Sequence, residues 1–202
     1  MDIGRPYSDV IPGARGRLFA TLAQLEVPVT VRALARHAGI SPQTALNLVD
    51  DLSGTGIVQV ERVGGMMLVQ LNRDHILAEP IEALVRSRGR LIQRLRDHLE
   101  AWPLLAAAWM FGSAARGDGD RNSDIDLLLV AEASTEDSDW IDAVGALADQ
   151  LQAWTGNEIQ IVEYSWEAFV RLVHEDNLLV AALRSEGIAL TARSRERLRD
   201  AA

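Results

Sequence analysis

The sequence has no cysteine, no lysine and only four histidines among its 202 residues. The lack of cysteine excludes disulfides and metal sites built on thiolates. The histidines, at positions 37, 75, 98 and 174, do not show the short spacing of a histidine-based metal motif. Any bound metal is therefore expected to have mainly oxygen ligands.

Long apolar runs are also missing. No segment reaches the roughly 18 consecutive apolar residues that would span a bilayer, and the first residues do not resemble a signal peptide. We therefore expect a cytoplasmic protein with no membrane contact. Apolar residues make up 48% of the chain, which is enough for one large domain or two small ones with apolar cores.

Negative charge is concentrated in the second half of the chain. Residues 1–74 contain 7 arginines and 7 acidic residues, whereas residues 105–202 contain 8 arginines and 18 acidic residues. Acidic surfaces repel the phosphates of nucleic acid. Any nucleic-acid binding is therefore expected in the first half.

The pattern of residues 14–71 predicts three helices followed by a β-hairpin. Apolar residues recur at helical spacing in the second and third segments, so these two helices are expected to pack together. The boundaries carry residues typical of helix caps and turns, namely Thr30, Gly39, Ser41, Pro42, Gly56 and the pair Gly64-Gly65. This is the order of a winged helix-turn-helix, which we expect over residues 1–74.

In a winged helix-turn-helix, the third helix usually enters the major groove and the wing contacts DNA nearby. Asp50 and Asp51 on the predicted third helix would repel phosphate, and residues 1–74 have a net charge near zero. We therefore expect modest affinity per protomer and a homodimer on double-stranded DNA. The alternative is that the module contacts protein. The expected DNA contacts are Gln43, Thr44 and Asn47 to base edges and Arg32, Arg36 and Arg62 to the backbone.

Residues 75–103 repeat apolar side chains with a helical period, which predicts an amphipathic connecting helix. Residues 104–202 then alternate apolar strand-like segments with amphipathic helical ones. This pattern is typical of helices layered on a sheet. The predicted fold is α+β with two domains, in which the C-terminal domain has a mixed sheet.

One polar loop in the C-terminal domain lies between two apolar strands. Asp124 and Asp126 are two residues apart at the start of the second strand, so their side chains face the same side. Paired carboxylates repel unless a cation lies between them, and Mg²⁺ or Mn²⁺ takes such ligands together with phosphate oxygens. Gly112 and Ser113 follow the first strand, where glycine lets a phosphate approach the main chain. Arg116 adds a positive charge that suits a polyphosphate.

The loop and its flanks resemble the DNA polymerase β-type nucleotidyltransferase superfamily. The shared pattern is an apolar residue, Gly-Ser, a gap of ten residues, and then Asp-apolar-Asp-apolar. The sequence is most similar to its minimal nucleotidyltransferase (MNT) branch, over about residues 105–191. The resemblance implies that Gly112 and Ser113 hold the phosphates of a nucleoside triphosphate and that Asp124 and Asp126 hold the metal. It also implies transfer of a nucleotide to a protein or small molecule with release of pyrophosphate.

The family usually supplies a third carboxylate from a later strand, and the corresponding position here is Gln160. An amide can bind a metal through its carbonyl oxygen but cannot act as a base near neutral pH. Glu158 shares the face of Gln160 and would reach the site after a shift of strand pairing. Glu163 faces the other way and would need a bulge at Val162.

The sequence therefore predicts a DNA-binding regulator fused to an MNT-like domain that binds Mg²⁺ and a nucleoside triphosphate. Nucleotide transfer is one hypothesis. A second is a transcription regulator that senses a nucleotide with weak or no transfer. A third is an antitoxin-like partner of a toxin encoded beside it.

Overall fold

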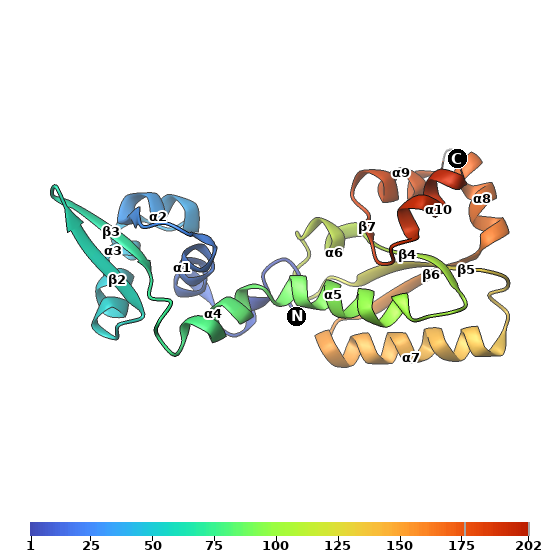
Figure 1. Cartoon of the computed structure of the whole chain (residues 1–202), viewed down its shortest axis with the longest axis horizontal. Helices are drawn as coiled ribbons and strands as arrows, with labels where there is room; N and C mark the ends of the chain where they lie inside the picture. The colour runs from blue at the N-terminus through green and yellow to red at the C-terminus, as the bar shows by residue number, and fades with distance from the viewer. Residues whose placement is uncertain (176, 202) are drawn as a thin grey trace. The chain divides into compact units, whose positions relative to one another are not determined.

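The computed structural model describes residues 1–175 and 177–201 and divides the chain into two compact units (Figure 1). The first unit is Arg5–Arg88, and the second combines Met1–Gly4 with Gly89–Ala202. The division after Arg88 falls inside the segment 75–103, for which the sequence predicts a connecting helix.

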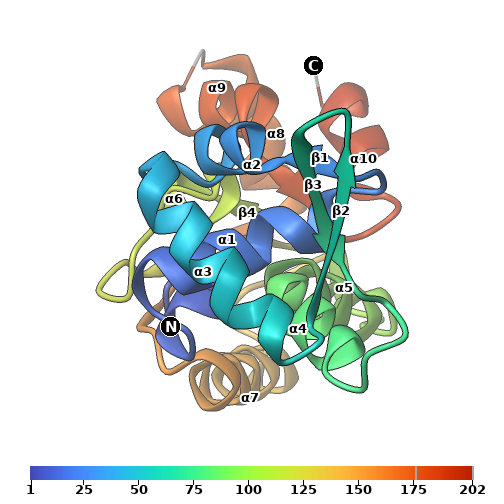
Figure 2. The same ribbon diagram turned by 90° about the vertical axis from the view of Figure 1, so that its left-hand side faces the viewer.

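The first unit contains the three predicted helices and the predicted hairpin, seen end-on in Figure 2. Its strands form an antiparallel sheet in the order β1-β3-β2. Its elements are η1 (Pro6–Asp9), α1 (Gly13–Gln24), β1 (Val29–Thr30), α2 (Val31–Ala38), α3 (Pro42–Gly54), β2 (Val58–Val63), β3 (Met66–Leu71) and α4 (Ala78–Val85).

Local residues set the boundaries of these elements. The side chains of Thr30 and Ser41 each accept a hydrogen bond from a main-chain N–H three residues later, which caps α2 and α3. Gly39 ends α2 with a left-handed φ of +62°. Gly64 and Gly65 have φ values of +55° and +81°, the positive values that a tight two-residue hairpin turn requires.

The predicted connecting helix is two helices, α4 and α5 (Ser87–Glu100), separated at Arg86. Serine and glycine are poor helix formers, and Ser87 and Gly89 lie at this junction. The hydroxyl of Ser87 also donates a hydrogen bond to the carbonyl oxygen of Ala83. These local preferences interrupt a segment whose apolar period is otherwise continuous.

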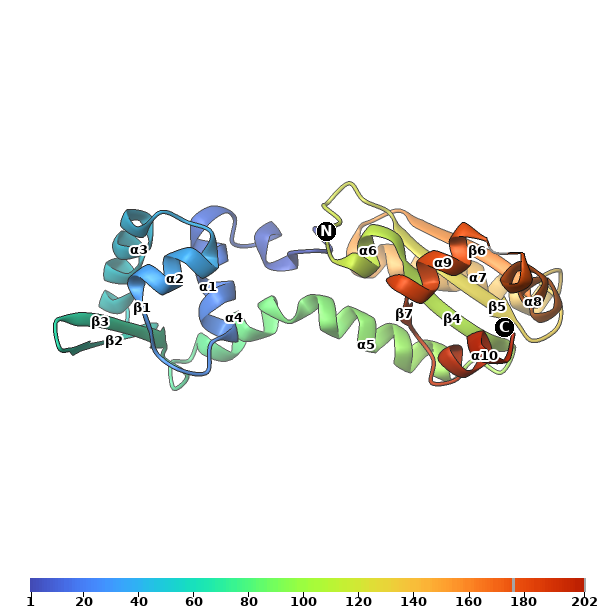
Figure 3. The same ribbon diagram turned by 90° about the horizontal axis from the view of Figure 1, so that it is seen from above.

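The second unit has a four-stranded sheet in the order β6-β5-β4-β7, seen from above in Figure 3. Strands β5 and β6 are parallel and the other pairs are antiparallel, so the predicted mixed sheet is confirmed. After α5 the elements are β4 (Leu105–Phe111), α6 (Gly112–Arg116), β5 (Ile125–Ala131), α7 (Ser138–Thr155), β6 (Ile159–Ser165), α8 (Trp166–His174), α9 (Leu178–Ser185), β7 (Ile188–Ala189) and α10 (Ser194–Asp200).

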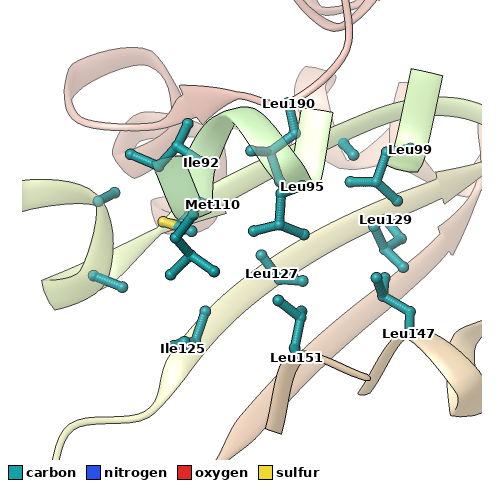
Figure 4. Packing of buried hydrophobic residues seen from close by; sticks show 14 of the residues in the cluster. Ile92, Leu95, Leu99, Met110, Ile125, Leu127, Leu129, Leu147, Leu151 and Leu190 are labelled. Atoms are coloured by element: carbon teal, nitrogen blue, oxygen red, sulfur yellow. The ribbon is translucent and has the colours of Figure 1, made fainter. Parts of the chain in front are cut away.

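Helices α5 and α7 cover one face of this sheet, and α8, α9 and α10 cover the other. Along β5, Ile125, Leu127 and Leu129 pack toward the leucines of α5 and α7 (Figure 4). The alternate residues Leu128 and Val130 pack toward α8 and α9. Among the described residues, no helix has the length and hydropathy needed to cross a membrane.

Candidate functional site

The two aspartates of the polar loop lie where three strands meet. Asp126 is the second residue of β5 and pairs with Phe111 at the end of antiparallel β4 and with Gln160 near the start of parallel β6. Asp124 immediately precedes β5. The alternation of the sheet therefore places Asp126 and Gln160 on the same face, the face covered by α8–α10.

Gly112 lies directly against one of these carboxylates. Its φ is +66°, a left-handed value that favours glycine, and a Cβ added there would lie 2.5 Å from Asp126 Oδ2. A side chain at position 112 would therefore displace the Asp126 carboxylate. The predicted glycine and the predicted aspartate, fourteen residues apart in sequence, are in contact.

Electrostatics at Asp126 favour a cation. Burial raises the pKa of the Asp126 carboxyl above its usual value, and the neighbouring Asp124 raises it further. Arg116 acts in the opposite direction but is the smallest of the three effects. A positive ion between the two carboxylates would therefore stabilise both in their ionised form.

Gln160 reaches across from β6 to the other aspartate. Its Nε2 donates a hydrogen bond to Asp124 Oδ2 at 2.5 Å. The residue at the position expected for a third carboxylate is thus an uncharged amide in direct contact with Asp124. It can offer a metal a carbonyl oxygen but adds no negative charge.

Glu163 faces away from the aspartates, as its position in the strand predicts. The β5–β6 register runs unbroken from Ile125 and Ile159 to Ala131 and Ser165, which leaves no bulge at Val162 within these described strands. Glu163 lies on the opposite face, where its Oε2 accepts a hydrogen bond from Nε1 of the buried Trp140 at 2.6 Å. This carboxylate satisfies a buried indole N–H.

Glu158 precedes β6 by one residue, and its carbonyl oxygen accepts a hydrogen bond from the N–H of Ile125 at 2.9 Å. With Gln160 it lines a shallow hollow at the edge of the sheet, together with Ala148, Asp149 and Gln152 of α7. The continuous register provides no shift of pairing of the kind proposed to bring Glu158 to the aspartates.

The loop between α6 and β5 is tightly folded. The carbonyl oxygen of Ser113 accepts hydrogen bonds from the N–H groups of residues 117, 118 and 119. Gly119 packs so closely on Ser113 that an added Cβ would lie 3.2 Å from the Ser113 Oγ. The guanidinium of Arg116 binds the carboxylates of Asp118 and Glu186 at 3.1 and 2.9 Å, which raises the pKa of Arg116. Arg116 therefore stays charged beside the loop.

One residue that holds this loop, Asn157, is not indicated by any sequence pattern. Asn157 is 2% exposed, and its Nδ2 donates hydrogen bonds to the carbonyl oxygens of Ser123 and Met1 at 2.9 and 3.0 Å. Asn157 follows Gly156, which ends α7, so the sequence marks it only as a residue after a helix. Its partners are distant in sequence, and local patterns do not indicate them.

The residues expected to contact DNA all lie in the first unit. Arg32 and Arg36 are exposed on α2, and Arg62 is exposed on β2. On α3, Gln43 and Asn47 are exposed and hydrogen-bonded to each other at 2.8 Å.

Thr44 of α3 is half-buried, and its hydroxyl shares a hydrogen bond with that of Ser41. Asp51 of the same helix pairs with Arg15 at 2.6 Å, which partly offsets the negative charge that opposes DNA binding on this helix.

The aspartate pair can supply only part of a metal's coordination shell. Within residues 1–175 and 177–201, no group of three or more His, Cys, Asp or Glu side chains is arranged to hold a metal ion. Two carboxylates and the Gln160 carbonyl suit a hard ion that completes its shell with water or phosphate, as Mg²⁺ does. The donor set therefore fits Mg²⁺ or Mn²⁺ bound together with a phosphate ligand.

Comparison with known protein families gives one match. Residues 93–181 match the family model described as "Polymerase beta, Nucleotidyltransferase". This part of the chain, which includes both aspartates, Gly112 and Gln160, is a nucleotidyltransferase-like domain. The expectation drawn from the sequence is confirmed at this level. No curated protein matches the chain.

Solved structures give weaker likenesses. A "toxin-antitoxin with AMP-PNP" is 25% identical and aligns over 56% of this chain and 79% of its own, with a TM-score of 0.36. The "toxin-antitoxin MntA-HpeT mutant-D39ED41E" is 23% identical over the same shares, with a TM-score of 0.35. Human N-acetylserotonin methyltransferase in complex with SAM is 19% identical over 44% of this chain and 28% of its own, with a TM-score of 0.29. Scores this low do not establish a shared fold.

Proposed function

We propose that the second unit binds a nucleoside triphosphate together with Mg²⁺ or Mn²⁺ at the aspartate pair. The observation that carries the proposal is the contact of Asp126 with Gly112, which places a carboxylate of raised pKa against a main chain without a side chain. In this proposal Gly112 and Ser113 lie against the phosphates, and Asp124 and Asp126 hold the metal. The nucleotidyltransferase match over residues 93–181 supports it.

The chemistry of Gln160 favours binding over transfer. Attack by a hydroxyl on a phosphate is helped by a nearby base, and an amide cannot accept the proton near neutral pH. Gln160 instead donates a hydrogen bond to Asp124. We therefore propose a nucleotide-sensing domain with weak or no transfer. Transfer to a protein or small molecule is the second candidate, because the family match includes the aspartates on which transfer would depend.

Calorimetry with AMP-PNP and Mg²⁺ tests the binding proposal. Wild type is expected to bind, and Asp124→Asn and Asp126→Asn are each expected to lose at least about tenfold in affinity, because a charged ligand to the metal is removed. Asp142→Asn is the matched control, since it makes the same charge change on exposed α7 away from the hollow that Gln160 lines. Equal affinity in all four proteins, or no binding by wild type, would overturn the proposal.

Transfer is measured separately, by incubating wild type with α-labelled ATP, GTP, CTP or UTP and Mg²⁺ in a cell extract that supplies acceptors. The sensing proposal expects labelled product at no more than the level seen with Asp126→Asn. Label that depends on Asp126 would instead establish the transferase as the function.

We also propose that the first unit is a winged helix-turn-helix that binds double-stranded DNA. Support comes from the order of α1, α2, α3 and the β2–β3 hairpin, and from the exposed arginines on α2 and β2. Titration of labelled duplex DNA with the full chain at several salt concentrations tests it, and light scattering in the same samples tests the expected homodimer. Lack of binding at low salt would count against a role on DNA.

A further inference from the structure

Residues Met1–Gly4 pack on the second unit, although the next residue in sequence belongs to the first. Ile3 is 1% exposed within the apolar core beneath α5 and α7. The N–H of Gly4 donates a hydrogen bond to the carbonyl oxygen of Gly119 at 2.9 Å. In the described chain the polypeptide thus passes between the two units at two places, after Gly4 and after Arg88.

The contact at Gly4 depends on the absence of a side chain. A Cβ at this position would lie 2.5 Å from the carbonyl oxygen of Gly117 and 3.1 Å from that of Gly119. Both atoms belong to the main chain, so neither can move aside as a side chain could. Gly4 therefore allows the segment to lie directly on the loop 117–123.

This loop connects the two halves of the proposed nucleotide site. It follows α6, which contains Ser113, and it ends immediately before Asp124. Gly119, the residue bound by Gly4, packs against the Ser113 side chain. At the other end, the Asn157 side chain joins the carbonyl oxygens of Met1 and Ser123. The segment Met1–Gly4 and the loop are thus held together at both ends of the loop.

The chain reaches the first unit immediately after this contact. Pro6 is buried in the first unit, where it begins η1, a short helix that packs on α1 and α4. Only Arg5 separates Pro6 from Gly4, and two residues span at most about 7 Å. Proline also fixes its own φ, which limits freedom at this point. A single residue, Arg5, therefore separates the docked segment from the start of η1.

We propose that Met1–Gly4 couples occupancy of the nucleotide site to the first unit, an inference that rests on the proposed nucleotide-binding function. A ligand that contacts Ser113 and Asp124 stabilises the loop conformation on which Met1–Gly4 docks. Docking then restrains Arg5 and the start of the first unit, which carries the proposed DNA-binding surface. Coupling of this kind is reciprocal, so DNA bound to the first unit changes nucleotide affinity by the same factor.

The test uses the full chain and takes advantage of its lack of cysteine. Cysteines introduced at Val10 and Ile141, which are 67% and 55% exposed in the first and second units, carry spin labels. Double electron–electron resonance then measures the distribution of distances between the labels, with and without AMP-PNP and Mg²⁺. Calorimetry on the same proteins measures whether the ligand binds.

The expected result is that the ligand narrows the distance distribution in the labelled protein with an otherwise native sequence. Gly4→Ala is expected to show a broad distribution with and without ligand and to bind AMP-PNP at least about fivefold more weakly, the lower end of typical coupling. Gly145→Ala is the control, because no described atom apart from its chain neighbours and its own helix backbone lies within 4 Å of its added Cβ. It is expected to match the native sequence.

The two proposals fail in different ways. If AMP-PNP does not bind the native sequence, the proposed function is wrong and the coupling falls with it. If AMP-PNP binds but leaves the distribution unchanged, or if Gly4→Ala responds like the native sequence, only the coupling is overturned. If Gly4→Ala does not fold by circular dichroism, Ile3→Ala decides, because it weakens docking through lost packing, and a native-like response in this variant also overturns the coupling.

Discussion

Replacing Gly112 by alanine affects two properties of this glycine, its left-handed backbone and its contact with Asp126, and a control variant separates them. An alanine held at a φ of +66° costs about 1 to 2 kcal/mol relative to glycine. In a chain of this size that cost lowers the melting temperature by about 2 to 8 °C. The added Cβ would also lie 2.5 Å from Asp126 Oδ2, so the carboxylate must move from its place beside the main chain.

Gly156→Ala is the matched control for this substitution. Gly156 lies in the same unit with a φ of +72°, and no described atom apart from its chain neighbours lies within 4 Å of an added Cβ. The two variants therefore share the backbone cost, and only Gly112→Ala disturbs the aspartate. We expect a loss of melting temperature in both, and a loss in Gly112→Ala that is at least as large as that in Gly156→Ala.

Affinity for the nucleotide distinguishes the two variants. Calorimetry with AMP-PNP and Mg²⁺ is expected to show at least about a tenfold loss of affinity in Gly112→Ala, comparable to the loss of a charged contact. Gly156→Ala is expected to bind like wild type. If Gly112→Ala keeps wild-type affinity, or if both variants lose it equally, the contact with Asp126 does not contribute to binding as argued.

Three further substitutions test the charges at the two proposed sites. Because the pKa of Asp126 is raised in the folded protein, ionisation of this carboxyl destabilises the fold as the pH rises through that pKa. Asp126→Asn is therefore expected to raise the ligand-free melting temperature at pH 7.5. This gain should vanish as the pH falls toward 3.8, the ordinary pKa of an aspartate. An equal gain at both ends of this range would contradict the burial argument. Gln160→Glu adds a third carboxylate, so it is expected to lower the stability of the metal-free protein and to strengthen Mn²⁺ binding. Gln152→Glu places a carboxylate on α7 in the hollow that Gln160 also lines, and it should have neither effect. Arg32→Ala is expected to weaken duplex binding and to lower the slope of log affinity against log salt by about one, and an unchanged slope, equal to that of Arg171→Ala in the second unit, would remove Arg32 from the DNA surface.

Features with a local cause were predictable from the sequence. Thr30 and Ser41 cap their helices because the side chain and the N–H that it accepts from are three residues apart. The Gly64-Gly65 turn needs only its own φ values and two strands of matching length. Strand β5 was predictable because its residues are apolar on both faces, as in a strand covered by helices on both sides.

Features that depend on distant contacts were not predictable. Strand alternation predicts that Glu163 faces away from the aspartates, but only the unbroken register of β5 and β6 excludes a bulge at Val162, and only the structure identifies Trp140 as its partner. The break at Arg86 lies in a continuous apolar period, where weak local preferences decide the outcome. The role of Gly4 depends on main-chain atoms more than a hundred residues away, which a single sequence does not indicate.

Gln160 affects the proposed site in two opposite ways, and both follow from its lack of charge. Without a metal, a carboxylate at this position would lie beside Asp124, and a third negative charge would further disfavour ionisation of Asp126, which burial already disfavours. The amide instead donates a hydrogen bond to Asp124 and adds no charge beside it. One divalent ion is then sufficient to balance the two remaining carboxylates. The residue that removes a base for nucleotide transfer therefore also keeps a third negative charge out of the ligand-free site, which suits the proposed binding and release of a nucleotide without turnover.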